Sequence, residues 1–96
     1  MKAYFVITNG YNMVVFEQDG KCKCNDGKNG YLDGIDLYAT DDDNSYDVPK
    51  IVNDLKTYFE TNDINGFSEL YGDEYDTDEI FDPQWGDEIT YICDID

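Results

Sequence analysis

Six carboxylates lie within one short stretch of the second half of the chain. The stretch from Tyr71 to Asp82 reads YGDEYDTDEIFD and contains no cation. Its acids are Asp73, Glu74, Asp76, Asp78, Glu79 and Asp82. Clustered carboxylates can bind a hard cation such as Ca²⁺, or they can bind a basic surface of another molecule. Because each one also raises the self-repulsion of the compact state, the cluster needs a physical explanation.

Calcium binding is the first chemistry to test. A loop of the EF-hand type needs oxygen ligands at its first, third and fifth positions, Gly at the sixth and Glu at the twelfth. No loop that begins at Asp41, Thr61 or Asp76 meets all of these requirements; the loop from Thr61, for example, has Gly66 in place but ends on Gly72. The sequence is therefore compatible only with weak divalent-cation binding, and we expect no dedicated metal site.

The cysteines give little more. Cys22 and Cys24 form a C-x-C pair and Cys93 is far away in the sequence, while the chain has no His. Three thiolates and a carboxylate are a poor zinc set, and an odd number of cysteines does not suit a disulfide framework. We expect reduced thiols that pack in the core, with no cofactor.

Catalytic side chains are also scarce. The chain has neither His nor Arg, and its two serines are Ser45 and Ser68, so a Ser-His-acid or Cys-His arrangement cannot be assembled. Glycine-rich phosphate-binding motifs are missing from the sequence as well. With 23 acids, some pair will always lie at a workable separation, so carboxylate pairs carry no information. The sequence predicts a protein that is not an enzyme.

The charge is large and unevenly distributed. Against the 23 acids stand six Lys, which gives a net charge of −17. Residues 1–56 hold ten acids and all six Lys, a balance of −4, whereas residues 57–96 hold thirteen acids and no cation, a balance of −13. Nucleic acid and anionic membranes are thereby excluded as direct partners, because their phosphates would be repelled. A basic protein is the expected partner.

Charge density decides whether such a segment could imitate a polynucleotide. Duplex DNA carries one charge per about 1.7 Å of axis. The six acids between Asp73 and Asp82 would give one charge per roughly 5.5 Å if extended and one per roughly 2.5 Å if helical. Further partner contacts are expected from the acids Asp41, Asp42, Asp43, Asp87 and Glu88 and from the aromatic residues Tyr75 and Trp85.

In these properties the chain resembles the small acidic inhibitors that phages and plasmids use against host nucleic-acid enzymes: anti-CRISPR proteins, anti-restriction proteins and uracil-glycosylase inhibitors. The resemblance covers size, the cation-free acidic half, the aromatic content and a compact body, without a shared motif. It implies a non-catalytic protein that blocks a Lys/Arg-lined DNA or RNA channel, for instance that of a Cas effector or another host nuclease, in the cytoplasm of the host bacterium.

Three alternatives stay open. An immunity protein that neutralises a basic toxin nuclease would use the same electrostatics. A weak divalent-cation binder would use the same carboxylates. A merely acidic soluble protein would carry them as a solvated coat, which is the usual role of charge runs.

The elements that position these residues begin with a meander. Asn9-Gly10 and Asp19-Gly20 are hairpin turn signals, and they predict strands at about 2–8, 11–18 and 21–24. Both faces of this meander are substantially apolar. One face carries Tyr4, Val6, Met13, Val15, Cys22 and Cys24, and the other carries Ala3, Phe5, Ile7, Val14, Phe16, Lys21 and Lys23. One face must pack on a helix, and the other either meets the C-terminal half or is a contact surface.

The rest of the chain contains one clear helix. It should open near Asp47 or Val48, with Pro49 in its first turn, and end near Asn62 or Gly66 in a left-handed residue. Its apolar stripe is Val48, Ile51, Val52, Leu55, Tyr58 and Phe59. Alternation predicts strands at 35–40 and 88–95, the latter turning Ile89, Tyr91, Cys93 and Ile95 to one side. Ile80, Phe81 and Trp85 should anchor the acidic stretch.

These elements predict an α+β fold: an antiparallel sheet of four to five strands, made of the N-terminal meander and a C-terminal strand, with one amphipathic helix on one face. At 96 residues, we expect residues 1–96 to form a single domain. The oligomeric state is open, and a sheet face could form a dimer.

Overall fold

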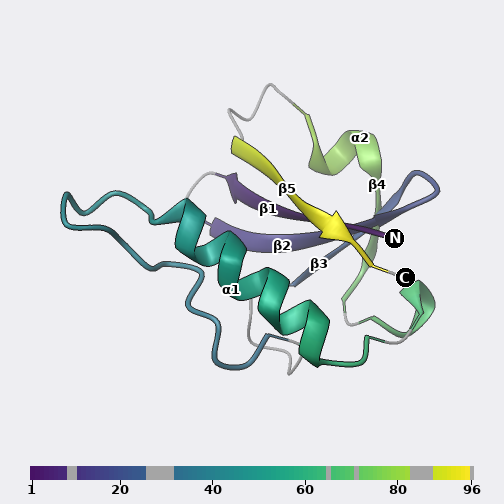
Figure 1. Cartoon of the computed structure of the whole chain (residues 1–96). Helices are drawn as coiled ribbons and strands as arrows, with labels where there is room; N and C mark the ends of the chain where they lie inside the picture. Colours follow the sequence, from purple (N-terminus) through teal and green to yellow (C-terminus); the bar gives the residue numbers. More distant parts are fainter. Residues whose placement is uncertain (9–10, 26–31, 65, 71, 83–87, 96) are drawn as a thin grey trace.

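The protein is an antiparallel five-stranded sheet with one long helix across it (Figure 1). The computed structural model describes residues 1–8, 11–25, 32–64, 66–70, 72–82 and 88–95. Spatially, the strands follow the order β4-β3-β2-β1-β5. The α+β arrangement predicted from the sequence is thus confirmed, with the N-terminal meander in the middle of the sheet and the C-terminal strand at one edge.

The meander consists of β1 (Lys2–Thr8), β2 (Tyr11–Gln18) and β3 (Lys21–Asn25). Between β2 and β3, Asp19 and Gly20 have φ angles of 54° and 82°, the left-handed values that a tight hairpin requires. The Asn9-Gly10 turn lies outside the described residues, although Thr8 pairs with Tyr11 on either side of it. Both faces have the composition expected from the alternation.

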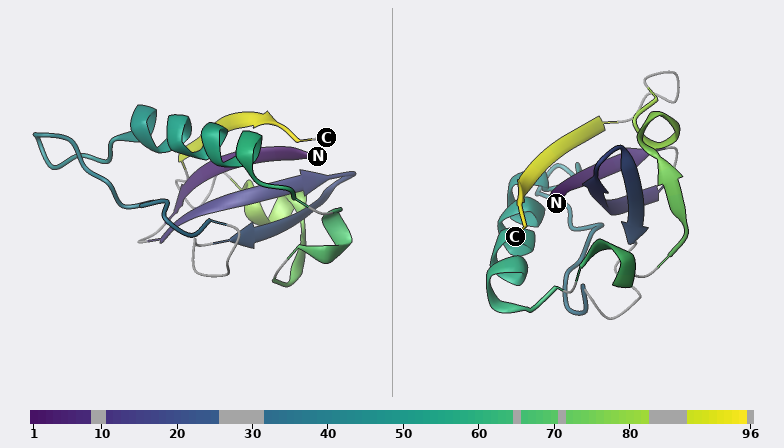
Figure 2. Two further views of the ribbon diagram at one scale, coloured as in Figure 1. Left: turned by 60° about the horizontal axis from the view of Figure 1, so that its bottom comes forward. Right: turned by 90° about the vertical axis from the view of Figure 1, so that its right-hand side faces the viewer.

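Each face of the sheet has its own core. The helix-side core contains the buried residues Ala3, Phe5, Val14, Phe16, Leu32, Leu37, Ile51, Leu55, Leu70 and Ile92. The second core is smaller and contains Val6, Val15 and Cys22, with Tyr4, Met13, Cys24, Ile80 and Phe81 packed around them. Figure 2 (right) shows α1 and α2 on opposite sides of the strands. The second apolar face therefore meets the C-terminal half of the chain.

Helix α1 (Val48–Thr61) follows the predicted pattern at its start. The Asp47 carboxylate accepts a hydrogen bond from the backbone N–H of Lys50 at 3.1 Å, and Pro49 occupies the first turn. The predicted left-handed end is wrong. Asn62 is extended, with φ −117°, and both its backbone N–H and its side-chain amide donate to the Tyr58 carbonyl at 2.9 Å. Side-chain capping replaces the glycine-type cap.

The strand predicted at residues 35–40 is also wrong. This segment forms turns, because the Asp36 carboxylate accepts a hydrogen bond from the backbone N–H of Tyr38 at 2.9 Å and bends the chain locally. Leu37 is nevertheless buried, and its carbonyl accepts a hydrogen bond from the Asn12 side chain at 2.6 Å. The apolar residues of the segment fill the helix-side core from a loop, not from a strand.

The remaining elements are short except for the last strand. A 3₁₀ turn, η1 (Phe67–Glu69), precedes β4 (Glu74–Asp76), and α2 (Thr77–Ile80) follows directly. Strand β5 (Glu88–Asp94) pairs with β1. No helix within the described residues is long and apolar enough to cross a membrane.

A bulge in β5 overturns the predicted alternation of its side chains. Tyr4 pairs with Tyr91, but Ala3 pairs with Cys93, so Ile92 is the extra residue. Because of this shift, Ile92 and Cys93 both contribute to the helix-side core. Ile89, Tyr91, Cys93 and Ile95 therefore do not share one side as predicted, and Ile89 and Tyr91 are exposed.

Leu55 tests the helix-side core. It is fully buried at the centre of the α1 stripe, so Leu55→Ala should lower the free energy of unfolding by about 2–5 kcal/mol, measured by urea denaturation. The exposed Asn53→Ala on the polar face of α1 is the control and should change it by no more than about 0.5 kcal/mol. Equal effects of the two substitutions would contradict this packing.

Candidate functional site

The acidic segment, defined as Asp73–Asp82, is attached to an edge of the sheet by its backbone. Strand β4 pairs antiparallel with β3, which brings Asp76 opposite Lys21 and Glu74 opposite Lys23. Immediately afterwards, the Thr77 N–H donates to the Gly20 carbonyl at 3.0 Å. The chain then turns into α2, and the acidic segment has a defined path from strand to helix (Figure 1).

Helix α2 is only one turn long, and acidic side chains stabilise it. Asp76 and Glu79 form a capping box, in which Glu79 Oε2 accepts a hydrogen bond from the Asp76 N–H at 3.0 Å. Asp78 and Glu79 also lie in the first turn, where negative charge interacts favourably with the helix dipole. Part of the carboxylate cluster therefore stabilises its own local structure.

Two apolar side chains anchor the acidic segment. Ile80 and Phe81 pack against the second core, and the Phe81 ring lies edge-on to Tyr4 with 5.1 Å between centroids. The N–H of Phe81 donates to the Thr77 carbonyl at 3.0 Å, which closes the helical turn above these anchors. These two of the three predicted anchors are confirmed, whereas Trp85 lies outside the described residues.

The carboxylates of the acidic segment face solvent. Asp73, Glu74, Asp76, Asp78 and Glu79 are exposed, and Asp82 is partly buried. Tyr75, in the middle of β4, is 40% exposed, and its side chain points to the opposite face of the strand from those of Glu74 and Asp76. With apolar anchors beneath and carboxylates outside, the segment presents an ordered negative surface.

Nearby cations are occupied. Lys21 forms an ion pair with Asp76, and the pKa of Lys21 is raised by this hydrogen bond and by the charge of Asp76. Lys23 lies on the same face of β3 but is buried, and its Nζ donates to the Leu70 carbonyl at 3.0 Å. Within the acidic segment, Asp73, Glu74 and Asp78 have carboxylates that make no hydrogen bond or ion pair inside the described chain.

The spacing of these charges lies between the two limits derived from the sequence. Strand β4 advances by about 3.3 Å per residue and α2 by about 1.5 Å, so the six carboxylates fall between one per roughly 5.5 Å and one per roughly 2.5 Å of backbone. A single strand of duplex DNA carries one phosphate per about 3.4 Å. The acidic segment is therefore comparable in charge density with one DNA strand.

The other candidate residues lie elsewhere. The loop that carries Asp41–Asp43 extends from the opposite end of the molecule (Figures 1 and 2). There, Asp41 Oδ1 accepts hydrogen bonds from the backbone N–H groups of Asp43 and Ser45 at 2.9 and 3.1 Å. Glu88 begins β5 at the far edge of the sheet from β4, and Asp87 lies outside the described residues. Asp41–Asp43 thus do not extend the acidic segment.

The cysteines do not form a reactive or metal-binding group. Cys22 and Cys24 share the second face as predicted, whereas Cys93 packs into the helix-side core. Burial raises the pKa of all three thiols, that of Cys24 to about 11, so they stay protonated at neutral pH. Within the described residues, no three His, Cys, Asp or Glu side chains are grouped as metal ligands.

Two features of the site were not found from the sequence. One is the pairing of Lys21 with Asp76, which joins residues 55 positions apart in the chain. The Asp19-Gly20 turn and the adjacent Lys21 can be recognised in the sequence, but the Lys21–Asp76 contact follows only from the β3–β4 pairing. The other is β4 itself, because its three residues are all exposed and lack an apolar alternation.

Phe81 tests how the acidic segment is held. Phe81→Ala removes an anchor from the second core, so the segment should open more often while the rest of the sheet stays folded. Cleavage after Glu74 and Glu79 by a glutamate-specific protease should become about tenfold faster, the equivalent of about 1.4 kcal/mol of local stability. Asp73→Asn, which alters the charge of the segment outside β4 and α2 and removes no anchor, is the control. Unchanged cleavage in Phe81→Ala would show that the ring does not hold the segment.

Comparisons with known proteins identify no relative. No protein-family model, no curated protein and no solved structure matches this chain. Its function is therefore inferred from the geometry of its own residues.

Proposed function

We propose that this protein is a non-catalytic, stoichiometric inhibitor whose acidic segment occupies the basic nucleic-acid-binding site of a nuclease or CRISPR effector. The observation that carries the proposal is the sidedness of the segment. Ile80 and Phe81 face the second core, while Asp73, Glu74 and Asp78 are exposed and unpaired within the described chain. An array of this kind offers negative charge in a fixed arrangement, as a polynucleotide backbone does.

Order in the free protein favours tight binding. A disordered acidic tail would lose conformational entropy when it docks, and this loss would weaken its affinity. Here the β3–β4 pairing and the capping box of α2 already fix the backbone. Because no ordering cost opposes binding, charge attraction to a basic partner can raise both the affinity and the association rate.

The exposed ring of Tyr75 adds a contact that charge alone does not provide. Tyr side chains bury much apolar area at a small entropic cost, and they are enriched among the residues that dominate binding energy. Tyr75 is 40% exposed and lies between Glu74 and Asp76 in β4. It can stack on an Arg or an aromatic side chain in the channel where a base would otherwise stack.

Inhibition assays test the proposal directly. The purified protein is mixed with a Cas nuclease and its guide RNA, a restriction enzyme and a toxin nuclease, each with its nucleic-acid substrate. Inhibition of one of them at equimolar protein is expected, and it should weaken as salt is added because exposed charges are screened. Inhibition of the toxin nuclease alone would identify an immunity protein. No inhibition in any assay at low salt would contradict the proposal.

Three neutral substitutions locate the effect. Asp73→Asn, Glu74→Gln and Asp78→Asn together should weaken inhibition about tenfold or more, since three exposed ion pairs with a basic channel are worth about 0.5 kcal/mol each. The matched control is Asp33→Asn, Asp42→Asn and Asp43→Asn, which changes the net charge equally but at exposed positions outside the acidic segment. Equal weakening by both triple variants would indicate a general charge effect and not a site.

A further inference from the structure

The two edge strands of the sheet, β4 and β5, differ in how easily another strand could pair with them. At one edge, β4 has only three residues, all exposed, two of them acids, and such an edge resists pairing with another strand. At the other edge, β5 has seven residues and pairs only with β1 in the described structure. The long edge strand has an open row of backbone hydrogen-bonding groups.

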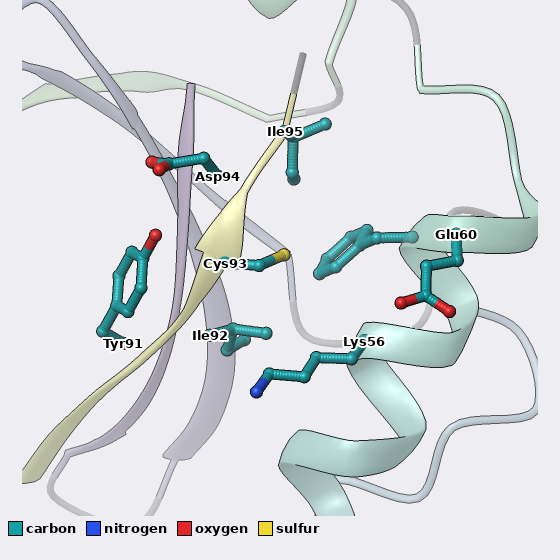
Figure 3. Close-up of a pocket in the computed structure, with 8 residues that line it drawn as sticks. Lys56, Glu60, Tyr91, Ile92, Cys93, Asp94 and Ile95 are labelled. Atoms are coloured by element: carbon teal, nitrogen blue, oxygen red, sulfur yellow. The ribbon is translucent and has the colours of Figure 1, made fainter.

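A groove follows this open edge. It has a volume of about 520 Å³, and one wall consists of the five consecutive residues from Tyr91 to Ile95. Because of the bulge at Ile92, Ile92 and Cys93 both line this groove, which lies beside the edge strand β5. Lys56, Phe59 and Glu60 of α1 form the other wall (Figure 3). The groove therefore lies between the edge strand β5 and the last turns of α1.

Apolar side chains stand on both sides of this edge. Ile89 and Tyr91 are 40% and 50% exposed on the second face. On the helix side, the side chains of Ile92 and Cys93 point toward α1 (Figure 3). An added strand alternates its own side chains between two faces, so it can contact Ile89 and Tyr91 on one face and the partly exposed Cys93 on the other while its backbone pairs with β5. Main-chain hydrogen bonds would give affinity, and these side chains would give selectivity.

Charge argues against a second copy of this chain in the groove. Antiparallel pairing of two β5 strands about Tyr91 places Glu88 of one copy opposite Asp94 of the other, at both ends of the pairing. Like charges directly opposite are destabilising, and each copy also carries a net charge of −17. A strand with cations at both ends would instead find a carboxylate opposite each of them.

The groove lining itself is compatible with a basic strand. Its charged side chains are Lys56, Glu60 and Asp94, a net negative charge. Lys56 extends from α1 toward the strand (Figure 3), so it favours an uncharged residue at the middle of the occupant. Cations near the two ends and uncharged residues between them are the complementary pattern.

We propose that the open edge of β5 binds an extended basic segment of a partner protein as a sixth strand of the sheet. This surface is the β5 edge of the sheet, whereas the acidic segment joins the sheet through β4 at the opposite edge, so the proposal goes beyond the proposed function and does not depend on it. Occupation of both edges would let one molecule bind a basic partner at two places.

A peptide of known sequence tests the proposal. The probe is fluorescently labelled Lys-Thr-Val-Thr-Val-Thr-Lys, and its binding is measured by fluorescence anisotropy on the full chain. In a second version, alternate residues are N-methylated, so the N–H groups of only one edge of the peptide strand are blocked. Its other edge can still pair with β5, and this version should still bind. A version N-methylated on both edges has the same charge but cannot pair with β5, and it should lose binding. Equal binding of the fully methylated peptide would show attraction by charge alone and overturn the proposal.

Protein variants locate the peptide. Glu88→Gln with Asp94→Asn should weaken binding about tenfold, whereas the matched pair Asp42→Asn with Asp43→Asn should leave it unchanged. The triple variant Asp73→Asn, Glu74→Gln, Asp78→Asn should also bind the peptide normally, which separates this test from that of the inhibitor function. Sedimentation of the free chain gives the remaining outcome: a dimer that the peptide dissociates would make the second copy the occupant and overturn the proposal.

Discussion

The structure depends on one constraint: its sheet is apolar on both faces, so each face must be covered. Helix α1 covers one face through a stripe centred on Ile51 and Leu55. The described residues form no second long helix, and the other face is covered by Ile80 and Phe81 at the end of α2. The same residues that cover the second core thereby order the acidic segment that contains them.

This coupling explains how the fold tolerates so many like charges in one place. Burial of Ile80 and Phe81 is favourable, and it offsets the repulsion among neighbouring carboxylates, which are held outward in water. Lys21 reduces the repulsion further at Asp76, where β3 and β4 pair. The burial of Lys23 removes another cation from the surface. The acidic segment is therefore held on the sheet by β3–β4 pairing and by its apolar anchors, and it presents a stable negative surface.

Local signals predicted the parts of the fold that depend on neighbouring residues. Asp19-Gly20 set the second hairpin, and the α1 stripe with Asp47 as its cap set the helix. Residues 35–40 had the alternation of a strand, but the Asp36 side chain stabilises a turn there. The β5 bulge, the β3–β4 pairing and the distance of Asp41–Asp43 from the acidic segment depend on tertiary contacts, which a local pattern does not contain.

The most direct measurement is hydrogen exchange of two backbone amides in solution. The Thr77 N–H is bonded to the Gly20 carbonyl and the Phe81 N–H to the Thr77 carbonyl, both at 3.0 Å. If Ile80 and Phe81 hold the acidic segment on the sheet, both amides should exchange much more slowly than in an unstructured peptide of the same sequence. Exchange at the unstructured rate, with slow exchange in β1 and β2, would show a loose acidic segment beside a folded sheet and contradict the ordered negative surface.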